Sequence, residues 1–133
     1  MRNKLLFVIL FAVCPFVTAA EQQISNKHLR VRYNPDDGTL RAASIDTGRT
    51  FIDGNFSDCG KGTARTTNVN HTVLGKGKAI EITYDDGRLD RISLYRSIDF
   101  ILIQPILRNN SDKVINFKNV DLLDTQLSGP IAP

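Results

Sequence analysis

The chain has 133 residues, of which 41% are hydrophobic and 23% charged, and a formal net charge of +3. This length allows one domain with a modest core, because a domain of this size leaves roughly a third of its unfolded-chain surface exposed after folding. Lysine and arginine are interleaved with aspartate rather than clustered, so the composition gives no support for nucleic acid as a partner.

The first twenty residues are typical of an export signal. Arg2 and Lys4 precede an apolar stretch over 5–17 that is short for a bilayer span, and the small residues over 17–20 suit a signal peptidase. We therefore expect a signal peptide over 1–20 and a secreted or periplasmic protein, with a retained membrane anchor as the alternative. Losing Arg2 and Lys4 would lower the net charge to about +1.

The first half of the mature chain alternates apolar and polar residues with a period of two, which predicts strands. We expect strands over 24–33 and 39–45 and a short one from 50 to 52, with Gly-terminated turns between them. The segment 53–63 is the longest predicted loop, and a connecting role is favoured over a functional one. A further strand is expected over 63–74, broken by the glycines of 75–77.

The second half contains three short apolar runs, over 79–84, 92–95 and 100–107, closed by turn residues, which read as successive antiparallel strands. The run over 100–107 is apolar on both faces, which predicts cover on both sides. Pro105 indicates in addition an edge or a bulge, because proline cannot donate to a sheet ladder. A last strand is expected over 115–122, with a bulge near 118–119.

Together these patterns predict an all-β protein, an antiparallel β-sandwich over 21–124, with no helix longer than a turn or two after the signal. The tail over 125–133 reads as linker-like and as a candidate truncation point.

Acidic residues are the first candidates for chemistry, and their context favours structural roles. The pairs Asp36/Asp37 and Asp85/Asp86 lie in Gly-terminated turns, where aspartate bonds the local backbone, rather than where two carboxylates would flank a glycosidic bond or bind calcium. Glu81 lies in mid-strand on the predicted solvent face, where we expect a lysine or arginine partner on a neighbouring strand.

Cysteine and histidine add no recognisable site. Removal of Cys14 with the signal leaves Cys59 alone, and nothing in the sequence brings His28 or His71 to it, so we interpret Cys59 as an incidental thiol rather than a nucleophile. There is no zinc spacing, no calcium loop and no Gly-x-Ser-x-Gly elbow. We assign no catalytic, cofactor-binding or metal residue and expect no cofactor.

The order of strand and turn signatures is more specific than "sandwich". It resembles the N-terminal β-supersandwich domain of secreted α-galactosidase-like (melibiase-type) glycoside hydrolases. The segments that carry the resemblance are 24–33, 37–40, 75–87, 92–95, 100–104, 107–112 and 120–124.

The resemblance implies a non-catalytic domain that packs on a (β/α)8 barrel, because in that family the barrel carries the catalytic aspartates. A barrel needs on the order of 200 residues or more, and this sequence has only nine after Asp124. Hydrolysis is therefore not carried over to this chain. The implied partners are such a barrel domain and carbohydrate, without nucleic acid and without a membrane after signal cleavage.

Two alternatives stay open. A stand-alone carbohydrate-binding module would present exposed aromatic residues for sugar stacking. Tryptophan is absent, and Tyr33, Tyr84 and Tyr95 are spaced like core or cross-strand residues. A periplasmic structural or adaptor domain is the other alternative.

Overall fold

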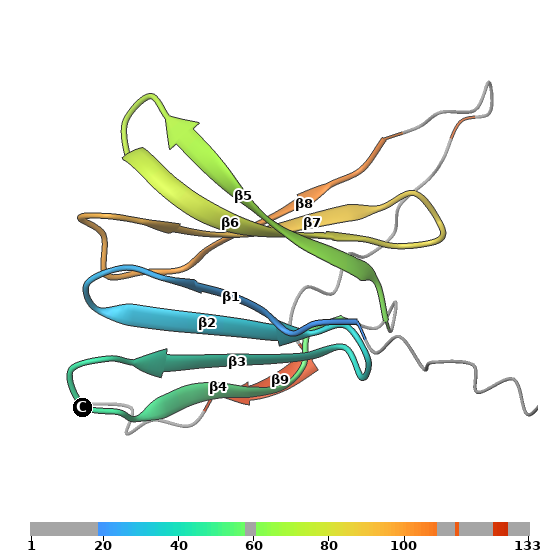
Figure 1. Cartoon of the computed structure of the whole chain (residues 1–133). Helices are drawn as coiled ribbons and strands as arrows, with labels where there is room; N and C mark the ends of the chain where they lie inside the picture. The colour runs from blue at the N-terminus through green and yellow to red at the C-terminus, as the bar shows by residue number, and fades with distance from the viewer. Residues whose placement is uncertain (1–18, 58–60, 109–113, 115–123, 128–133) are drawn as a thin grey trace, which may run out of the picture.

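The computed structural model describes residues 19–57, 61–108, 114 and 124–127. They form two antiparallel sheets that pack face to face, and none of these residues is helical (Figure 1). This confirms the prediction of an all-β sandwich. The predicted signal, Cys14, Cys59 and the predicted strand over 115–122 with its bulge lie outside the described residues. Among the described residues no helix is long and apolar enough to cross a membrane.

The first sheet has five strands in the order β1-β2-β3-β4-β9. The segment 24–33, expected to be one strand, is divided into two strands because the chain turns between Ser25 and Leu29. The strand predicted over 50–52 extends to Asn55, so it takes the first residues of the predicted loop. The bounds are β1 Gln22–Ser25, β2 Leu29–Asn34, β3 Thr39–Ser44, β4 Thr50–Asn55 and β9 Asp124–Leu127.

Strand β9 pairs antiparallel with β4, with Ile52 opposite Leu127 and Asn55 opposite Asp124. The strand therefore runs three residues into the segment 125–133, which the sequence pattern predicts to be linker-like. A β-bulge at Ala42 and Ala43 interrupts the pairing of β3 with β4.

The second sheet has four strands in the order β5-β6-β7-β8, which is also their order in the chain. They are β5 Thr63–His71, β6 Gly75–Thr83, β7 Leu89–Tyr95 and β8 Leu102–Ile106. The glycines of 75–77, expected to break a strand, instead open β6. Gly75 has φ +74°, a conformation that suits glycine, and completes the tight turn from β5.

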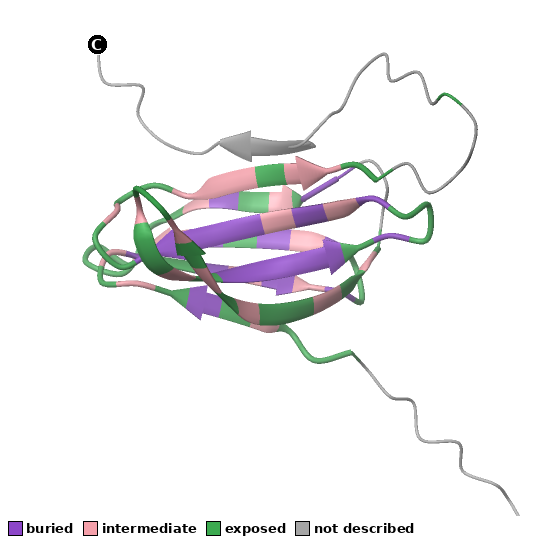
Figure 2. Ribbon diagram, turned by 90° about the horizontal axis from the view of Figure 1, so that it is seen from above, coloured by how far each residue is buried: buried purple, intermediate pink, exposed green. Residues whose placement is uncertain are grey.

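The core lies between the two sheets, where the inward faces of β1 to β4 meet those of β6 and β7. Figure 2 shows the buried positions gathered along the central strands. The three tyrosines are all buried, which confirms that their spacing marks core or cross-strand residues. The core cluster consists of Ile24, Leu29, Val31, Tyr33, Leu40, Ala42, Ile52, Phe56, Ile80, Ile82, Tyr84, Ile92 and Leu94.

Strand β8 is the edge of its sheet among the described strands, as Pro105 predicts. Ile101 and Ile103 pack against the core cluster. Phe100, in contrast, is 50% exposed, and Leu107 is also exposed. Among the described residues the run over 100–107 is therefore only partly covered, with apolar surface next to β8, and its cover by a further layer or domain stays a prediction.

Candidate ligand-binding site

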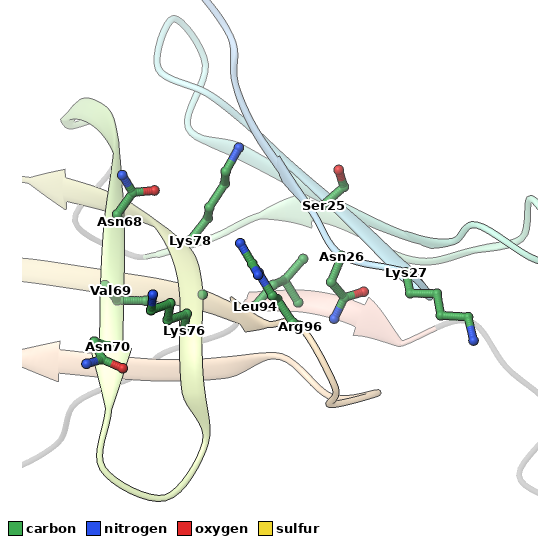
Figure 3. A pocket seen from close by; sticks show the side chains of 11 residues that line it. Ser25, Asn26, Lys27, Asn68, Val69, Asn70, Lys76, Lys78, Leu94 and Arg96 are labelled. Carbon is green, nitrogen blue, oxygen red and sulfur yellow. The ribbon is translucent and has the colours of Figure 1, made fainter.

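A hollow of about 670 Å³ opens between the two sheets where the β5–β6 hairpin turns away from β1. In Figure 1 the tip of this hairpin lifts off the five-stranded sheet, and Figure 3 shows the side chains that surround the resulting space. We call this hollow the basic wedge. It is lined by Ser25, Asn26, Lys27, Asn68, Val69, Asn70, Lys76, Gly77, Lys78, Leu94 and Arg96.

The wedge forms because the inward face of the second sheet changes from apolar to polar towards the hairpin. Alternate residues of a strand share a face, so Lys76 and Lys78 point to the same side as Ile80 and Ile82. Ammonium groups resist burial, whereas isoleucine favours it. The sheets therefore pack tightly at the isoleucines and stay apart, open to water, at the lysines.

Neighbouring strands contribute further polar groups to the same face. Asn68 of β5 lies directly opposite Lys78 in the β5–β6 register, and Leu94 of β7 lies on the other side of Lys78. Arg96 follows Leu94 by two residues, and its backbone N–H donates to the carbonyl of Lys76 at 3.3 Å. Amide and cationic side chains from β5, from β6 and from the residue that follows β7 therefore line one end of the sandwich.

The charge of the wedge has one sign. Its lining contains four cationic residues and no acidic one. Within the residues that the structure describes, none of the four forms an ion pair with a carboxylate. Figure 3 shows Lys27 extending away from the rest, so the cations that matter are Lys76, Lys78 and Arg96.

Asn26 lies at the base of the wedge, where its side chain has a structural role. Its side-chain amide donates to the carbonyls of Tyr95 and Ile98 at 2.9 and 2.7 Å, and its side-chain oxygen accepts from the N–H groups of His28 and Leu29 at 2.9 and 2.7 Å. An asparagine side chain offers two donors and one oxygen with two lone pairs. All four positions are used, so Asn26 holds the two sheets together and is not free to bind a ligand.

Three positions of the Gly-Lys-Gly-Lys sequence over 75–78 shape the wedge, whereas Gly77 pairs with Tyr95 and shares the outer face of β6 with Glu81. Gly75 makes the turn, and the two lysines face the hollow. At Gly77 a Cβ atom would lie 2.4 Å from the Leu94 carbonyl oxygen and 2.8 Å from Cδ1 of Tyr95. Only glycine lets the Tyr95 ring pack this closely over β6.

A second polar cluster lies buried towards the other end of β7. Arg88 and Asp90 form an ion pair at 3.2 Å without a well-aligned hydrogen bond, and both are largely buried. The Arg88 guanidinium also contacts the Ser57 hydroxyl and lies over the Tyr84 ring, 4.6 Å from its centroid. Burial raises the pKa of Asp90 and of Tyr84, and the Arg88 charge opposes the rise at Asp90. These contacts hold the strands together.

One aspartate of each Asp-Asp pair accepts a hydrogen bond from the backbone of its own turn. Asp37 Oδ1 accepts from the Thr39 N–H at 2.9 Å, and Asp86 Oδ1 accepts from the Arg88 N–H at 2.9 Å. The glycines that follow, Gly38 and Gly87, have φ values of +75° and +86°. The interpretation of both Asp-Asp-Gly segments as turns is confirmed.

Glu81 has the predicted partners but not the predicted solvation. It faces the outer side of the second sheet and is only 6% exposed. Arg65 on β5 and Arg91 on β7 flank it and donate to its two carboxylate oxygens at 2.8 and 2.7 Å. These hydrogen bonds lower the pKa of Glu81, with Arg65 the largest cause. The two arginine side chains cover the carboxylate, which is why Glu81 is buried on an outer face.

The two histidines do not meet. His28 Nδ1 lies 3.3 Å from Asp46 Oδ2 next to β2. His71 Nδ1 accepts from the N–H groups of Val73 and Leu74 in the β5–β6 turn, and its ring meets Tyr95 edge-on at 5.9 Å. In the part of the chain that the structure describes, no cluster of three or more His, Cys, Asp or Glu side chains could hold a metal ion.

No protein-family model matches this chain, and comparisons with curated proteins and with solved structures return no match.

The basic wedge is the feature that sequence reasoning missed. Its signal was present, because Lys76 and Lys78 share the parity of Ile80 and Ile82, while Glu81 has the opposite parity. Charged residues on the core-facing side of a predicted strand indicate either that the strand was predicted in the wrong register or that a ligand site lies there.

Proposed function

We propose that this chain is a non-catalytic β-sandwich domain that binds a saccharide in the basic wedge. The observation that carries the proposal is the wedge itself. Its volume of about 670 Å³ lies in the range of pockets that hold drug-sized ligands. Asn68, Lys76, Lys78 and Arg96 offer hydrogen-bond donors to it, and a saccharide is rich in the oxygen acceptors that such donors bind.

The burial and the contacts of the acidic side chains support the non-catalytic part of the proposal. Glycosidic hydrolysis uses two carboxyl groups about 5–9.5 Å apart on either side of one bond. Glu81 is clamped between two arginines, Asp90 is 1% exposed, and Asp37 and Asp86 hold turns. The lining of the wedge contains no acidic group.

Binding is tested by NMR titration of the purified protein with a panel of neutral and acidic tetrasaccharides. We expect amide shifts to move at Asn68, at 76–78 and at Arg96, and to stay in place on β3 and β4. A panel in which no saccharide moves the wedge resonances would overturn the proposal. Turnover of an aryl α-galactoside, abolished by changing one aspartate to asparagine, would overturn its non-catalytic part.

A second, more specific candidate is the N-terminal domain of a secreted α-galactosidase-like glycoside hydrolase. The sequence resemblance suggests it, and the apolar surface next to β8 favours it, because Phe100 and Leu107 would suit a packed neighbouring domain. Reading the DNA beyond the codon for Pro133 tests this candidate directly. A barrel-coding frame, together with loss of self-association when the barrel is supplied on the same chain, would support it. A stop codon at that point would count against it.

A further inference from the structure

We infer that the basic wedge selects an acidic saccharide, one with at least two carboxylate or sulfate groups, over neutral saccharides. This inference rests on the proposed function for the site and adds the charge of the ligand. The juxtaposition that carries it is that of Lys76, Lys78 and Arg96, which meet on one inward face with no carboxylate to neutralise them.

The three cations lie close together because of their places in the sheet. Lys76 and Lys78 are alternate residues of β6, so their Cα atoms lie about 6.5–7 Å apart. Arg96 is tied to Lys76 by the backbone hydrogen bond of 3.3 Å. Like charges this close repel one another, and an anion between them relieves that repulsion. A ligand needs more than one anionic group to pair with all three cations.

The chemistry of the cations also favours oxyanions. Hydrogen bonds between a cationic donor and a carboxylate or sulfate are about twice as strong as neutral ones, and arginine can bind such groups through two parallel bonds. Asn68, directly opposite Lys78, adds an uncharged donor and acceptor for a hydroxyl group. The wedge therefore combines sites for charge with a site for a sugar hydroxyl.

Neutral saccharides lack the usual means of binding here. Neutral sugars gain much of their affinity by stacking on exposed aromatic rings. Among the described residues the lining contains no aromatic side chain, and its apolar contribution comes from Val69 and Leu94. The same lack of a stacking platform argues against single-stranded nucleic acid, whose bases stack on aromatic side chains. Charge must therefore supply most of the affinity.

The inference is tested with a ligand pair that differs only in charge. Tetragalacturonate and its fully methyl-esterified form have the same sugar backbone, but the ester carries no carboxylate. We expect the acid to bind at the wedge at least ten-fold more tightly than the ester, and its affinity to fall as sodium chloride is raised from 50 to 300 mM. A heparin tetrasaccharide tests sulfate in place of carboxylate and should also bind at least ten-fold more tightly than the ester.

Two matched variants locate the effect. The double variant Lys76→Gln/Lys78→Gln should weaken binding of tetragalacturonate at least ten-fold, because it removes two charge-assisted contacts. The control Arg30→Gln/Arg49→Gln removes the same charge from exposed positions of β2 and of the β3–β4 connection and should change binding less than about two-fold. Unchanged thermal unfolding of both variants confirms that they fold.

The outcomes separate the inference from the proposed function. Equal affinity for the acid and its ester at the wedge, with Lys76→Gln/Lys78→Gln unaffected, would overturn the inference and leave saccharide binding intact. If no saccharide shifts the wedge resonances, the proposed function fails as well. Inorganic phosphate or a thymidine oligonucleotide that binds the wedge as tightly as tetragalacturonate would also overturn the selection of an acidic saccharide.

Discussion

Asn26 and Tyr95 join the two sheets at the base of the wedge, although they lie 69 residues apart in the chain. Asn26 lies in the turn between β1 and β2, and its side-chain amide donates to the Tyr95 carbonyl at 2.9 Å. The same side chain accepts from two N–H groups of its own turn. One polar residue thus fixes both the local turn and the place where the second sheet meets the first.

Asn26→Ala should lower the free energy of unfolding by about 2–6 kcal/mol, because it removes four hydrogen bonds that each contribute about 0.5–1.5 kcal/mol net. Asn26→Asp should not rescue stability, since a carboxylate would face the carbonyls of Tyr95 and Ile98. Urea unfolding at a constant m-value measures the loss. The control Asn68→Ala, at an exposed position, should stay within about 0.5 kcal/mol of the native protein. A loss as small as that of the control would contradict the role assigned to Asn26.

Gly77→Ala should destabilise the protein by about 1–3 kcal/mol, the typical cost of forcing an atom into a packed site. The added Cβ would meet backbone at Leu94 and the ring of Tyr95, and neither can yield without moving β7. Thermal unfolding measures the change. Thr83→Ala, an exposed position on the same strand, is the control and should have little effect. If Gly77→Ala is as stable as Thr83→Ala, the ring does not pack as described.

The turn over 85–87 should depend on its glycine more than on its aspartate. Asp86→Asn should cost less than Gly87→Val, because an asparagine oxygen can accept from the Arg88 N–H as the aspartate does. Gly87→Val should cost about 1–3 kcal/mol, because Gly87 has φ +86° and a β-branched side chain is strained there. No neighbouring atom would clash with the new Cβ, so the cost comes from the backbone alone. Equal tolerance of both changes in a denaturant titration would contradict this account.

The sequence predicted the elements whose causes are local. Alternation with a period of two located most strands, and the Asp-Asp-Gly segments located two turns, because glycine with positive φ and aspartate bonded to nearby backbone act within a few residues. Pro105 likewise marked an edge strand. These features do not depend on how the two sheets meet.

The features that sequence reasoning missed depend on contacts between distant residues. The turn that divides 24–33 into two strands is closed locally by Asn26, but the place where it docks is set by Tyr95 at the end of β7 and by Ile98 in the connection to β8. Burial of Glu81 requires arginines on both neighbouring strands. The basic wedge requires the β5–β6 hairpin to diverge from β1, which alternation within a single strand does not specify.

Glu81 should stabilise the protein in a manner that depends on pH. Its pKa in the folded protein lies below the usual 4.5, because Arg65 and Arg91 hydrogen-bond the ionised carboxylate. A carboxyl whose folded pKa is depressed contributes stability above its unfolded pKa and loses that contribution as the pH falls through its folded pKa. The stability difference between the native protein and Glu81→Gln should therefore be about 1–2 kcal/mol at pH 7 and shrink towards zero below pH 4.

The difference between the two proteins is the informative quantity, because other titrating groups cancel in it. Asp90 in particular has a raised pKa, so its contribution to the free energy of unfolding would change with pH in the opposite direction. Asp53→Asn is the matched control, since the exposed pair of Asp53 with Arg41 at 2.9 Å should contribute at most about 0.5 kcal/mol. Urea unfolding of the three proteins from pH 2.5 to 7 gives the profiles. A Glu81→Gln difference that stays constant across this range would show that the two arginines do not favour the ionised carboxylate, and would refute the clamp described for the outer face of β6.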